Sequence, residues 1–352
     1  MKLSRRRIDS DTLPIGKLPS DLLKQSLSRI RVNDVSVLVG PSIGSDAALL
    51  DPSQQLIVAT SDPVTFATEH VGWYAVNINA NDVACLGGTP LWFLATLLLP
   101  KHSTLSTSER IFKDLLAACD SLGVTLIGGH TEITQGIDRP ILAGTMLGGV
   151  KRGKAILPGG AKPDDRLLLT KGIALEGTAL LAQEAAELLK SKGLTDSDLQ
   201  EARDLLRAPG ISVVRDALTA QEAGGVNAMH DPTEGGVATG ILEMAESAGV
   251  GVEVRKSTIP VLPICENICR ILRLDPLGLL ASGSLLLSVS PQGIEGVRNA
   301  LSEASIPVTE IGQITSASEG IHLLTPEGRI PIPRFDRDEF ARFLAGSPTQ
   351  AT

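Results

Sequence analysis

The chain of 352 residues carries 40 acidic and 32 basic side chains, which gives a formal net charge of -8, and 43% of its residues are hydrophobic. A chain of this length and apolar content can bury a large core, and it predicts two domains of roughly 150 to 200 residues each. The acidic balance argues against a nucleic-acid partner, because binding a phosphate backbone normally needs a clustered basic surface.

The chain shows no signal for a membrane or for secretion. Its longest apolar stretches, such as residues 94–99, are far shorter than the ~18 residues that a membrane-spanning helix needs. The basic run Arg5-Arg6-Arg7 is interpreted as a solvated tail, and no apolar stretch follows it that could form the core of a signal peptide. Four cysteines make no disulfide framework, and Cys265 and Cys269 are expected to be buried on one face of a helix. We therefore expect a cytoplasmic protein.

In chain order, residues 1–35 are polar and predict an N-terminal arm with one short helix at residues 20–31. From residue 40, β-like runs at residues 56–60, 124–127 and 141–147 are separated by helical runs at residues 67–86 and 106–121. This alternation predicts a first α/β domain over residues 36–152.

A stretch dense in Gly, Pro and Lys at residues 151–165 interrupts the pattern and predicts the domain boundary. A second α/β domain is expected over residues 153–335, followed by a helix at residues 335–343 and a tail that ends at residue 352. The second domain's predicted helices are 177–192, 237–248 and 292–304, and its predicted strands are 167–170, 251–254, 284–289, 308–314 and 320–324.

Two aspartates of the first domain flank predicted strands. Asp46 precedes the strand-like pair Leu49-Leu50, and Asp62 follows the strand at residues 56–60. Each aspartate alone is an ordinary turn or helix-cap residue. Together they can hold a hard cation, because Mg²⁺ prefers one or two carboxylates plus phosphate oxygens. Through such a metal an acidic protein can bind an anionic nucleotide.

The helix predicted at residues 67–86 contains the polar segment Asn77-Ile78-Asn79-Ala80-Asn81-Asp82. Its apolar residues point in nearly every direction, so the helix should be buried. A bare carboxylate is costly to bury, and therefore Asn81 and Asp82 need a hydrogen-bond partner or a cation. A metal or a nucleotide would supply one, and a purely structural polar network is the alternative.

Two glycine pairs lie beside predicted strands. Gly128-Gly129 leads into His130-Thr131-Glu132 after the strand at residues 124–127, where a glycine pair would let backbone N–H groups approach a phosphate. Gly235-Gly236 ends the segment Asp231-Pro232-Thr233-Glu234 before the helix at residues 237–248, and such turns bind anions at a helix N-terminus. An N-cap aspartate with an acid three residues later explains the second segment equally well.

In this order and spacing, the motifs resemble the superfamily of aminoimidazole ribonucleotide (AIR) synthetase, selenophosphate synthetase, thiamine monophosphate kinase and the hydrogenase-maturation dehydratase HypE. The most specific element is Asn81-Asp82-Val83 followed by Gly87-Gly88-Thr89-Pro90-Leu91-Trp92-Phe93-Leu94, which is similar to the family's NDV/NDI-x-G-x-x-P-L-x-F-L signature. The segment at residues 231–236 looks like the DPTRGG of the hydrogenase-maturation branch, and Leu274-Asp275-Pro276-Leu277 matches its LDPL. The resemblance runs from about residue 40 to residue 324.

The resemblance implies a two-domain AIR synthase-like α/β fold. Its N-terminal sheet closes into a β-barrel across a homodimer interface, with ATP bound beside the barrel and a mixed α/β C-terminal domain. Mg²⁺ ligands are implied at Asp46, Asp62 and Asp82. His130 stands where the family's GGDT or GGET has an acid, and so Glu132 is the candidate substitute. The further ATP contacts that we assign to the motifs are Asn81, Gly128, Gly129, Thr131, Gly235 and Gly236.

Members of the superfamily transfer the γ-phosphoryl group of ATP to a nucleophile, while the protein positions the reactants and neutralises charge. The hydrogenase-maturation enzyme also uses a glutamate in an NEGK segment, which here is Ala281-Ser282-Gly283-Ser284, and a C-terminal cysteine, where this chain ends in Gln350-Ala351-Thr352. We therefore do not expect carbamoyl dehydration.

We expect a Mg-ATP-dependent small-molecule kinase, or a phosphate-activated dehydratase or cyclo-ligase, with Asp231, Glu132 and His130 as candidate catalytic residues. The acceptor is expected to be a free small molecule that enters beside Asp231. The apolar run at residues 91–99 is the candidate homodimer interface. A nucleotide-binding assembly or regulatory factor without catalysis is the alternative. A thiamine monophosphate kinase is disfavoured, because residues 231–235 do not match that family's DISDG.

Overall fold

The computed structural model describes residues 16–17, 20–39, 49–50, 55–67 and 69–346, and the chain forms two compact units. The first unit comprises Met1–Val83 and Pro90–Lys151, and the second comprises Ala84–Thr89 and Arg152–Thr352. The main change of unit thus falls at the start of the stretch rich in Gly, Pro and Lys. Asp46, the run from Arg5 to Arg7 and residues 347–352 lie outside the described residues.

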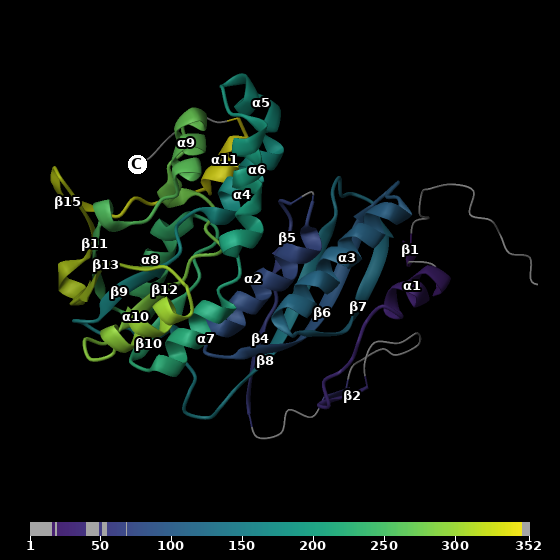
Figure 1. Ribbon diagram of the computed structural model, residues 1–352, viewed down its shortest axis with the longest axis horizontal. Helices are drawn as coiled ribbons and strands as arrows, with labels where there is room; N and C mark the ends of the chain where they lie inside the picture. The colour runs from purple at the N-terminus through teal and green to yellow at the C-terminus, as the bar shows by residue number, and fades with distance from the viewer. Residues whose placement is uncertain (1–15, 18–19, 40–48, 51–54, 68, 347–352) are drawn as a thin grey trace, which may run out of the picture. The chain divides into compact units, whose positions relative to one another are not determined.

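The first unit is built on a six-stranded sheet in the order β1-β7-β6-β8-β4, with β5 paired to β8 (Figure 1). Strands β6 and β7 are parallel, whereas the pairs β1–β7, β4–β8 and β5–β8 are antiparallel. Strands β2 and β3 form a separate antiparallel pair. The bounds are β1 (Gly16–Lys17), β2 (Val37–Val39), β3 (Leu49–Leu50), β4 (Leu56–Thr60), β5 (Pro63–Val64), β6 (Thr89–Pro100), β7 (Thr125–Thr134) and β8 (Ile141–Val150).

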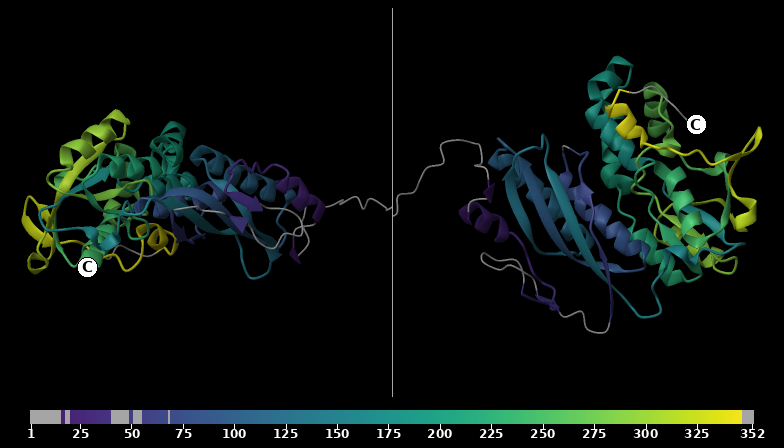
Figure 2. Two further views of the ribbon diagram at one scale, coloured as in Figure 1. Left: turned by 90° about the horizontal axis from the view of Figure 1, so that it is seen from below. Right: turned by 180° about the vertical axis from the view of Figure 1, so that it is seen from behind.

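Helices α2 (Val71–Cys85) and α3 (Leu105–Leu122) lie on one face of this sheet, and α1 (Ser20–Leu27) follows β1 in the chain (Figures 1 and 2). As predicted, α2 is buried on nearly every side. At Gly72 the two long helices approach so closely that a Cβ atom would lie 2.5 Å from the carbonyl oxygen of Ile111. A larger residue at this position would push α2 away from α3.

The apolar run at residues 91–99, expected at the dimer interface, is a central strand. Along β6 the side chains alternate between the two faces of the sheet. Leu97 and Leu99 are buried under the helices, whereas Leu94 and Leu98 are partly exposed on the other face. Much of the run therefore fills the unit's own core, and only the second set is available to a partner.

The second unit is built on a seven-stranded sheet in the order β10-β12-β9-β13-β11-β14-β15. All neighbouring pairs are antiparallel except β11–β14, which is parallel. The bounds are β9 (Arg166–Thr170), β10 (Val226–His230), β11 (Gly251–Arg255), β12 (Leu286–Val289), β13 (Val308–Thr315), β14 (Ile321–Thr325) and β15 (Gly328–Pro331).

Helices connect these strands and cover the buried apolar side chains of the sheet. Their bounds are α4 (Leu175–Glu184), α5 (Ala186–Ser191), α6 (Asp196–Asp204), α7 (Val214–Ala223), α8 (Gly236–Ala248), α9 (Pro263–Leu272), α10 (Ile294–Glu303) and α11 (Glu339–Leu344). The helix predicted at residues 177–192 is broken at Ala185, which has a non-helical φ of -110°. The helix predicted at residues 335–343 begins at Glu339, capped by Asp338. Cys265 and Cys269 are buried on α9, as expected.

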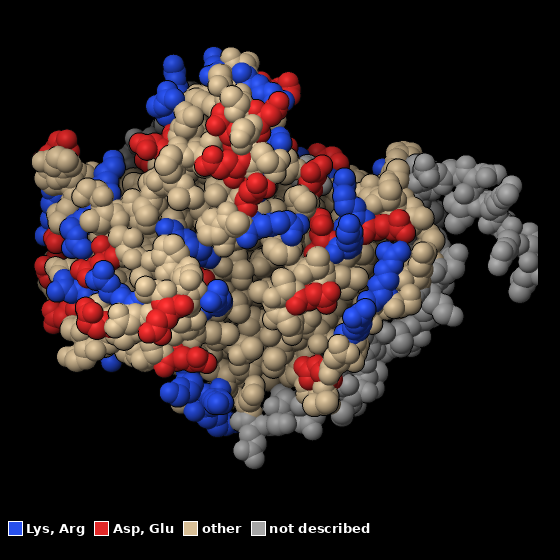
Figure 3. Space-filling view, viewed as in Figure 1, with Lys and Arg blue, Asp and Glu red and all other residues tan. Residues whose placement is uncertain are grey.

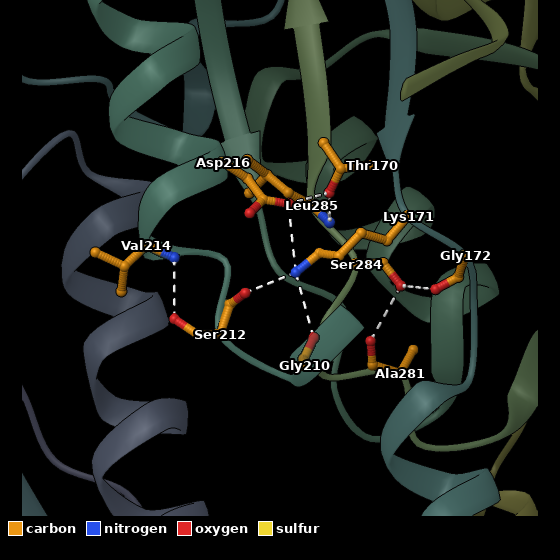
Figure 4. Close-up of polar contacts among 10 residues, drawn as sticks. All are labelled: Thr170, Lys171, Gly172, Gly210, Ser212, Val214, Asp216, Ala281, Ser284 and Leu285. Atoms are coloured by element: carbon orange, nitrogen blue, oxygen red, sulfur yellow. Dashed lines mark hydrogen bonds and ion pairs between the residues drawn. The ribbon is translucent and has the colours of Figure 1, made fainter. Parts of the chain in front are cut away.

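A buried lysine joins three segments of the second unit (Figure 4). The Nζ atom of Lys171 donates to the carbonyl oxygens of Ser212 at 2.6 Å and Gly210 at 3.3 Å, and it lies 3.4 Å from Oδ1 of Asp216. The hydroxyl of Thr170 donates to the same carboxylate oxygen at 2.7 Å. Burial lowers the pKa of Lys171, while the charge and hydrogen bond of Asp216 oppose that fall. This network fixes residues 210–212 against the end of β9.

No helix within the described ranges is long and apolar enough to cross a membrane. On the face shown in Figure 3, Lys and Arg side chains lie among Asp and Glu side chains over much of the surface. The absence of a nucleic-acid partner, expected from the acidic balance of the chain, remains a prediction.

Candidate functional site

Asn79 of α2 holds the chain at Asp62, just beyond the end of β4. Its Oδ1 atom accepts a hydrogen bond from the amide of Asp62 at 2.9 Å, and its Nδ2 atom donates to the carbonyl oxygen of Asp62 at 3.2 Å. The same Nδ2 atom also donates to the carbonyl oxygen of Ala75 at 2.8 Å. Because Asn79 is fully buried, these bonds set the position of Asp62 relative to the helix.

A second contact fixes Asp82 to the last residue of β4. The hydroxyl of Thr60 donates to Oδ2 of Asp82 at 2.8 Å. Asn81, one residue earlier in α2, is fully buried, whereas Asp82 is partly exposed. We call Thr60, Asp62, Asn79 and Asp82 the strand-end cluster. It contains two aspartates where β4 ends against α2.

The strand-end cluster offers hard oxygen donors, the type that Mg²⁺ prefers in proteins. Within the described residues, which exclude Asp46, no group of three or more His, Cys, Asp or Glu side chains lies close enough together to hold a metal ion. A magnesium ion at this cluster would therefore need phosphate oxygens or Asp46 to complete its ligands. The three-aspartate assignment stays a prediction.

The Gly128-Gly129 pair lies inside a strand, which differs from the sequence prediction. Strand β7 continues through this pair to Thr134, with Gly128 opposite Leu94 of β6 and Gly129 opposite Ala95. A Cβ atom at Gly129 would lie 2.0 Å from the carbonyl oxygen of Ala95, and its φ is 149°. The glycine therefore permits close packing of two strands, and the expected phosphate contact at this pair remains a prediction.

Strand β7 directs the next three residues to different faces of the sheet. Thr131 is buried, whereas the side chains of His130 and Glu132 are about 40% exposed, with His130 Nε2 3.3 Å from Glu132 Oε2. Because side chains alternate along a strand, His130 and Glu132 share the face opposite Thr131. Thr131 shares the helix-covered face, on which α2 carries Asp82. The catalytic roles predicted for His130 and Glu132 have no support from this arrangement.

Asp231 follows β10 directly and is buried. The thiol of Cys85 donates to its Oδ1 atom at 3.3 Å, and the division of the chain places both residues in the second unit. Asp231 is not the N-cap of α8, because that position belongs to Gly235, which adopts a left-handed φ of 77° and caps with no side chain. The capping alternative is therefore wrong. The burial of the Asp231 carboxylate must have another reason.

The amides of Gly235 and Gly236 already have protein partners. The amide of Gly235 donates to Oδ2 of Asp338 at 2.8 Å, and the amide of Gly236 donates to the carbonyl oxygen of Thr233 at 3.1 Å. A Cβ atom at Gly236 would lie 2.3 Å from the carbonyl oxygen of Leu277, so this glycine serves close packing. These two amides are therefore not available to the anion that we expected at this turn.

Two carboxyl groups near this turn were not predicted from the sequence. Glu176, in the first turn of α4, is 6% exposed, and burial raises its pKa to about 7. Burial likewise raises the pKa of Asp338 to about 6, although the amides of Gly235, Phe340 and Leu280 oppose the rise. A sequence signal existed for the first, because Glu176 is the one charged residue within the small and apolar segment at residues 172–182.

Family comparisons cover most of the chain. The model for the AIR synthase related protein N-terminal domain matches residues 44–150, and that for the C-terminal domain matches residues 162–323. A hydrogenase expression/formation protein of Methanocaldococcus jannaschii is 29% identical over 335 residues, which are 91% of this chain and 96% of that protein. Carbamoyl dehydratase HypE of Cupriavidus necator is 32% identical over 251 residues, which are 69% of this chain and 68% of that one.

Solved structures share the fold. HypE of Escherichia coli matches with a TM-score of 0.76 at 20% identity, over 92% of this chain and 98% of that chain. Thiamine-monophosphate kinase of Stenotrophomonas maltophilia matches with a TM-score of 0.67 at 21% identity, over 86% of this chain and 94% of that chain. The expected two-domain AIR synthase-like α/β fold is confirmed. The chain belongs to the AIR synthase-related protein family.

Proposed function

We propose that the protein binds Mg-ATP and transfers the γ-phosphoryl group to a small-molecule acceptor, as a kinase or as a phosphate-activated dehydratase or cyclo-ligase. The observation that carries the proposal is the strand-end cluster, where Thr60 and Asn79 fix Asp82 and the backbone of Asp62 beside one strand end. A scaffold protein has no use for an Asp82 carboxylate and an Asp62 backbone held in this way. The comparisons add support, because a HypE structure contains ATP and a thiamine monophosphate kinase structure contains AMPPCP and TMP.

In this proposal Asp62 and Asp82, with Asp46, hold Mg²⁺, which neutralises the charge of the triphosphate and of the transferring phosphoryl group. Asn81, Gly128, Gly129 and Thr131 remain proposed nucleotide contacts. Thr131 is the best placed of these, since it lies on the helix-covered face of β7. The hydrogen bonds of Thr60 and Asn79 preorganise the cluster, so that binding need not order these groups.

Asp231 is the proposed catalytic carboxylate. It lies at the end of β10 with one oxygen held by the thiol of Cys85, in a position where it can accept a proton from an acceptor hydroxyl or amide. Carbamoyl dehydration, the activity in the name of one relative, is not part of the proposal. Ser282 stands where the resemblance places that enzyme's glutamate, and a hydroxyl cannot serve as a carboxylate base.

We also propose a homodimer formed through the open face of the first unit's sheet. Leu94, Leu98, Ile141 and Leu147 lie on the face opposite α2 and α3, and each is only partly buried. An apolar sheet face of this kind is covered when two copies pack together. Light scattering at micromolar concentration should give twice the mass of the chain, and Leu98→Asp should halve it. A wild-type monomer would contradict this assignment.

ADP formation tests the proposed function. The protein is incubated with Mg-ATP and a panel of candidate acceptors, and ADP and phosphorylated products are followed by ³¹P NMR. We expect ADP that depends on protein, Mg²⁺ and one acceptor class, and a loss of at least about tenfold in turnover for Asp231→Asn, or ~1.4 kcal/mol in barrier. Cys85→Ala, which keeps the carboxylate, should lose less. ATP that binds without being cleaved would instead identify a non-catalytic assembly or regulatory factor.

A further inference from the structure

Glu176 and Ser282 form a buried polar pair in the second unit. Glu176 is 6% exposed and Ser282 is 1% exposed. The amide and hydroxyl of Ser282 lie close enough to limit the rise in the pKa of Glu176. Even so, Oε2 of Glu176 and Oγ of Ser282 have no partner with hydrogen-bond geometry in the described part of the chain. Buried polar atoms are nearly always paired in proteins, so two adjacent unpaired atoms point to a missing ligand group.

Two other segments, the turn before α8 and the start of α11, meet around this pair. The amide of Gly177 donates to the carbonyl oxygen of Leu280 at 3.0 Å, which joins the first turn of α4 to the segment that carries Ser282. The amide of Ala281 donates to the carbonyl oxygen of Thr233 at 3.3 Å, which joins that segment to the turn before α8. Asp338, which caps α11, accepts the amide of Gly235 in this same turn. We call Glu176, Glu234, Ser282 and Asp338 the acidic junction.

The charges of the acidic junction have one sign. The charged groups that act on Glu176 are Asp338 and Glu234, and both raise its pKa beyond the rise that burial causes. Glu234 also acts on Asp338 in the same direction. Glu234 is exposed, so the negative charge extends from the surface toward the buried Glu176. An anionic group is repelled from such a place, and a cation is attracted.

We propose that the acidic junction binds a cationic group of the small-molecule acceptor, either an ammonium, an amidinium or a guanidinium, with Glu176 as its main contact and Ser282 as a second hydrogen-bond partner. This deepens the proposed function and rests on it. A metal ion fits less well, since the described residues contain no group of three metal-binding side chains. The N–H groups of an organic cation match a carboxylate oxygen and a hydroxyl that both lack partners.

Without a ligand, a proton compensates the buried carboxyl group, because a bare carboxylate in that place is costly. A bound cation takes over this role and stabilises the charged form. Binding near pH 7 should therefore release a proton from Glu176. This proton release distinguishes a cation at Glu176 from one attracted loosely to the exposed Glu234.

The test uses agmatine, which carries an ammonium and a guanidinium group, in isothermal titrations at pH 7 without ATP. Titrations in buffers of different ionisation enthalpy measure the protons released. We expect binding in the millimolar range or tighter with proton release, at least tenfold weaker binding and no release for Glu176→Gln, and a smaller loss for Ser282→Ala. Glu187→Gln changes a glutamate whose side chain is 93% exposed and should behave as wild type.

Several outcomes would overturn the proposal. They are no binding at millimolar agmatine, equal affinity for wild type and Glu176→Gln, binding without proton release, and equal binding of the uncharged analogue butylurea. Circular dichroism melting of each variant separates loss of binding from loss of folding, and Ser282→Ala provides an independent readout if Glu176→Gln does not fold. Because these titrations contain no ATP, a failure of phosphoryl transfer leaves their result unchanged.

Discussion

The hydroxyl of Thr60 donates a 2.8 Å hydrogen bond to Oδ2 of Asp82 and ties the last residue of β4 to the last turn of α2. Thr60→Val keeps the shape of the side chain and removes this donor. We expect a three- to tenfold weaker affinity for Mg-ATP and a loss of about 1 kcal/mol in the free energy of unfolding, the usual net contribution of one hydrogen bond.

The matched control for this change is Thr134→Val, at the end of β7 in the same sheet. Both variants are compared by titration with Mg-ATP and by urea unfolding. Equal ATP affinity in Thr60→Val and wild type would show that the orientation of Asp82 is irrelevant to binding.

Asn79→Ala should destabilise the first unit by about 2–4 kcal/mol. The change removes three hydrogen bonds and leaves the amide of Asp62 without its partner, whereas the carbonyl oxygen of Asp62 keeps its bond from the amide of Gly144 at 2.9 Å. Asn77→Ala, in the same helix, removes one bond to the carbonyl oxygen of Trp73 and should cost clearly less. Chemical denaturation measures both, and a cost for Asn79→Ala no larger than that for Asn77→Ala would contradict the anchoring role.

Lys171→Met should destabilise the protein by about 3–5 kcal/mol, because it leaves the carboxylate of Asp216 buried without its cation. The carbonyl oxygens of Gly210 and Ser212 lose a donor as well. Lys192→Met, at an exposed position, is the control. A near-neutral result for Lys171→Met in thermal or urea unfolding would mean that packing around the residues in Figure 4 supplies the stability without the ion pair.

The ligand-free protein should lose stability as the pH rises from 5 to 8. The pKa of Glu176 is raised from 4.5 to about 7 and that of Asp338 from 3.8 to about 6. Below the unfolded values both states are protonated and the contribution is fully present. Above them the folded protein retains protons that the unfolded chain has released, so the free energy of unfolding falls until the pH passes the folded values.

At about 1.4 kcal/mol for each unit of pKa, the raised pKa of Glu176 contributes about 3 kcal/mol in all, of which about 2 kcal/mol is lost between pH 5 and 8. Glu176→Gln should flatten most of the decline in urea unfolding measured across this range, leaving a smaller slope from Asp338. A wild-type stability that rises between pH 5 and 8 would contradict the protonated state assigned to the buried carboxyl group.

The regular elements with strong apolar patterns were predictable from the sequence. Helix α2 was predicted as buried because its apolar residues face every direction, and strand β4 was predicted with its observed bounds, Leu56–Thr60. Helix α6 was missed, because its sequence is mostly charged and only Leu199 and Ala202 are buried. An apolar sequence pattern reflects which residues are buried. A helix with only two buried residues therefore has too weak a pattern to be predicted.

The candidate site was predictable only in part. The motif around Asp82 pointed to a carboxylate with a partner, but the identity of that partner, Thr60, depends on a contact between residues 22 positions apart. The glycine pairs were predicted to approach a phosphate or another anion. Close packing of Gly129 on Ala95 and of Gly236 on Leu277 requires the same residue type as a phosphate turn, so the sequence did not distinguish the two. Asp338 meets Gly235 across 103 residues, and no local pattern indicates this.

The most direct test of the account is an isothermal titration of Mg-ATP into wild type, Asp82→Asn and Asp120→Asn at equal free Mg²⁺. Asp120, on the exposed side of α3, is the matched control for the loss of one carboxylate. We predict Mg²⁺-dependent binding to wild type and Asp120→Asn, abolished by EDTA, and at least tenfold weaker binding to Asp82→Asn. Wild-type affinity in Asp82→Asn, or no binding of Mg-ATP to the wild-type protein, would contradict the account.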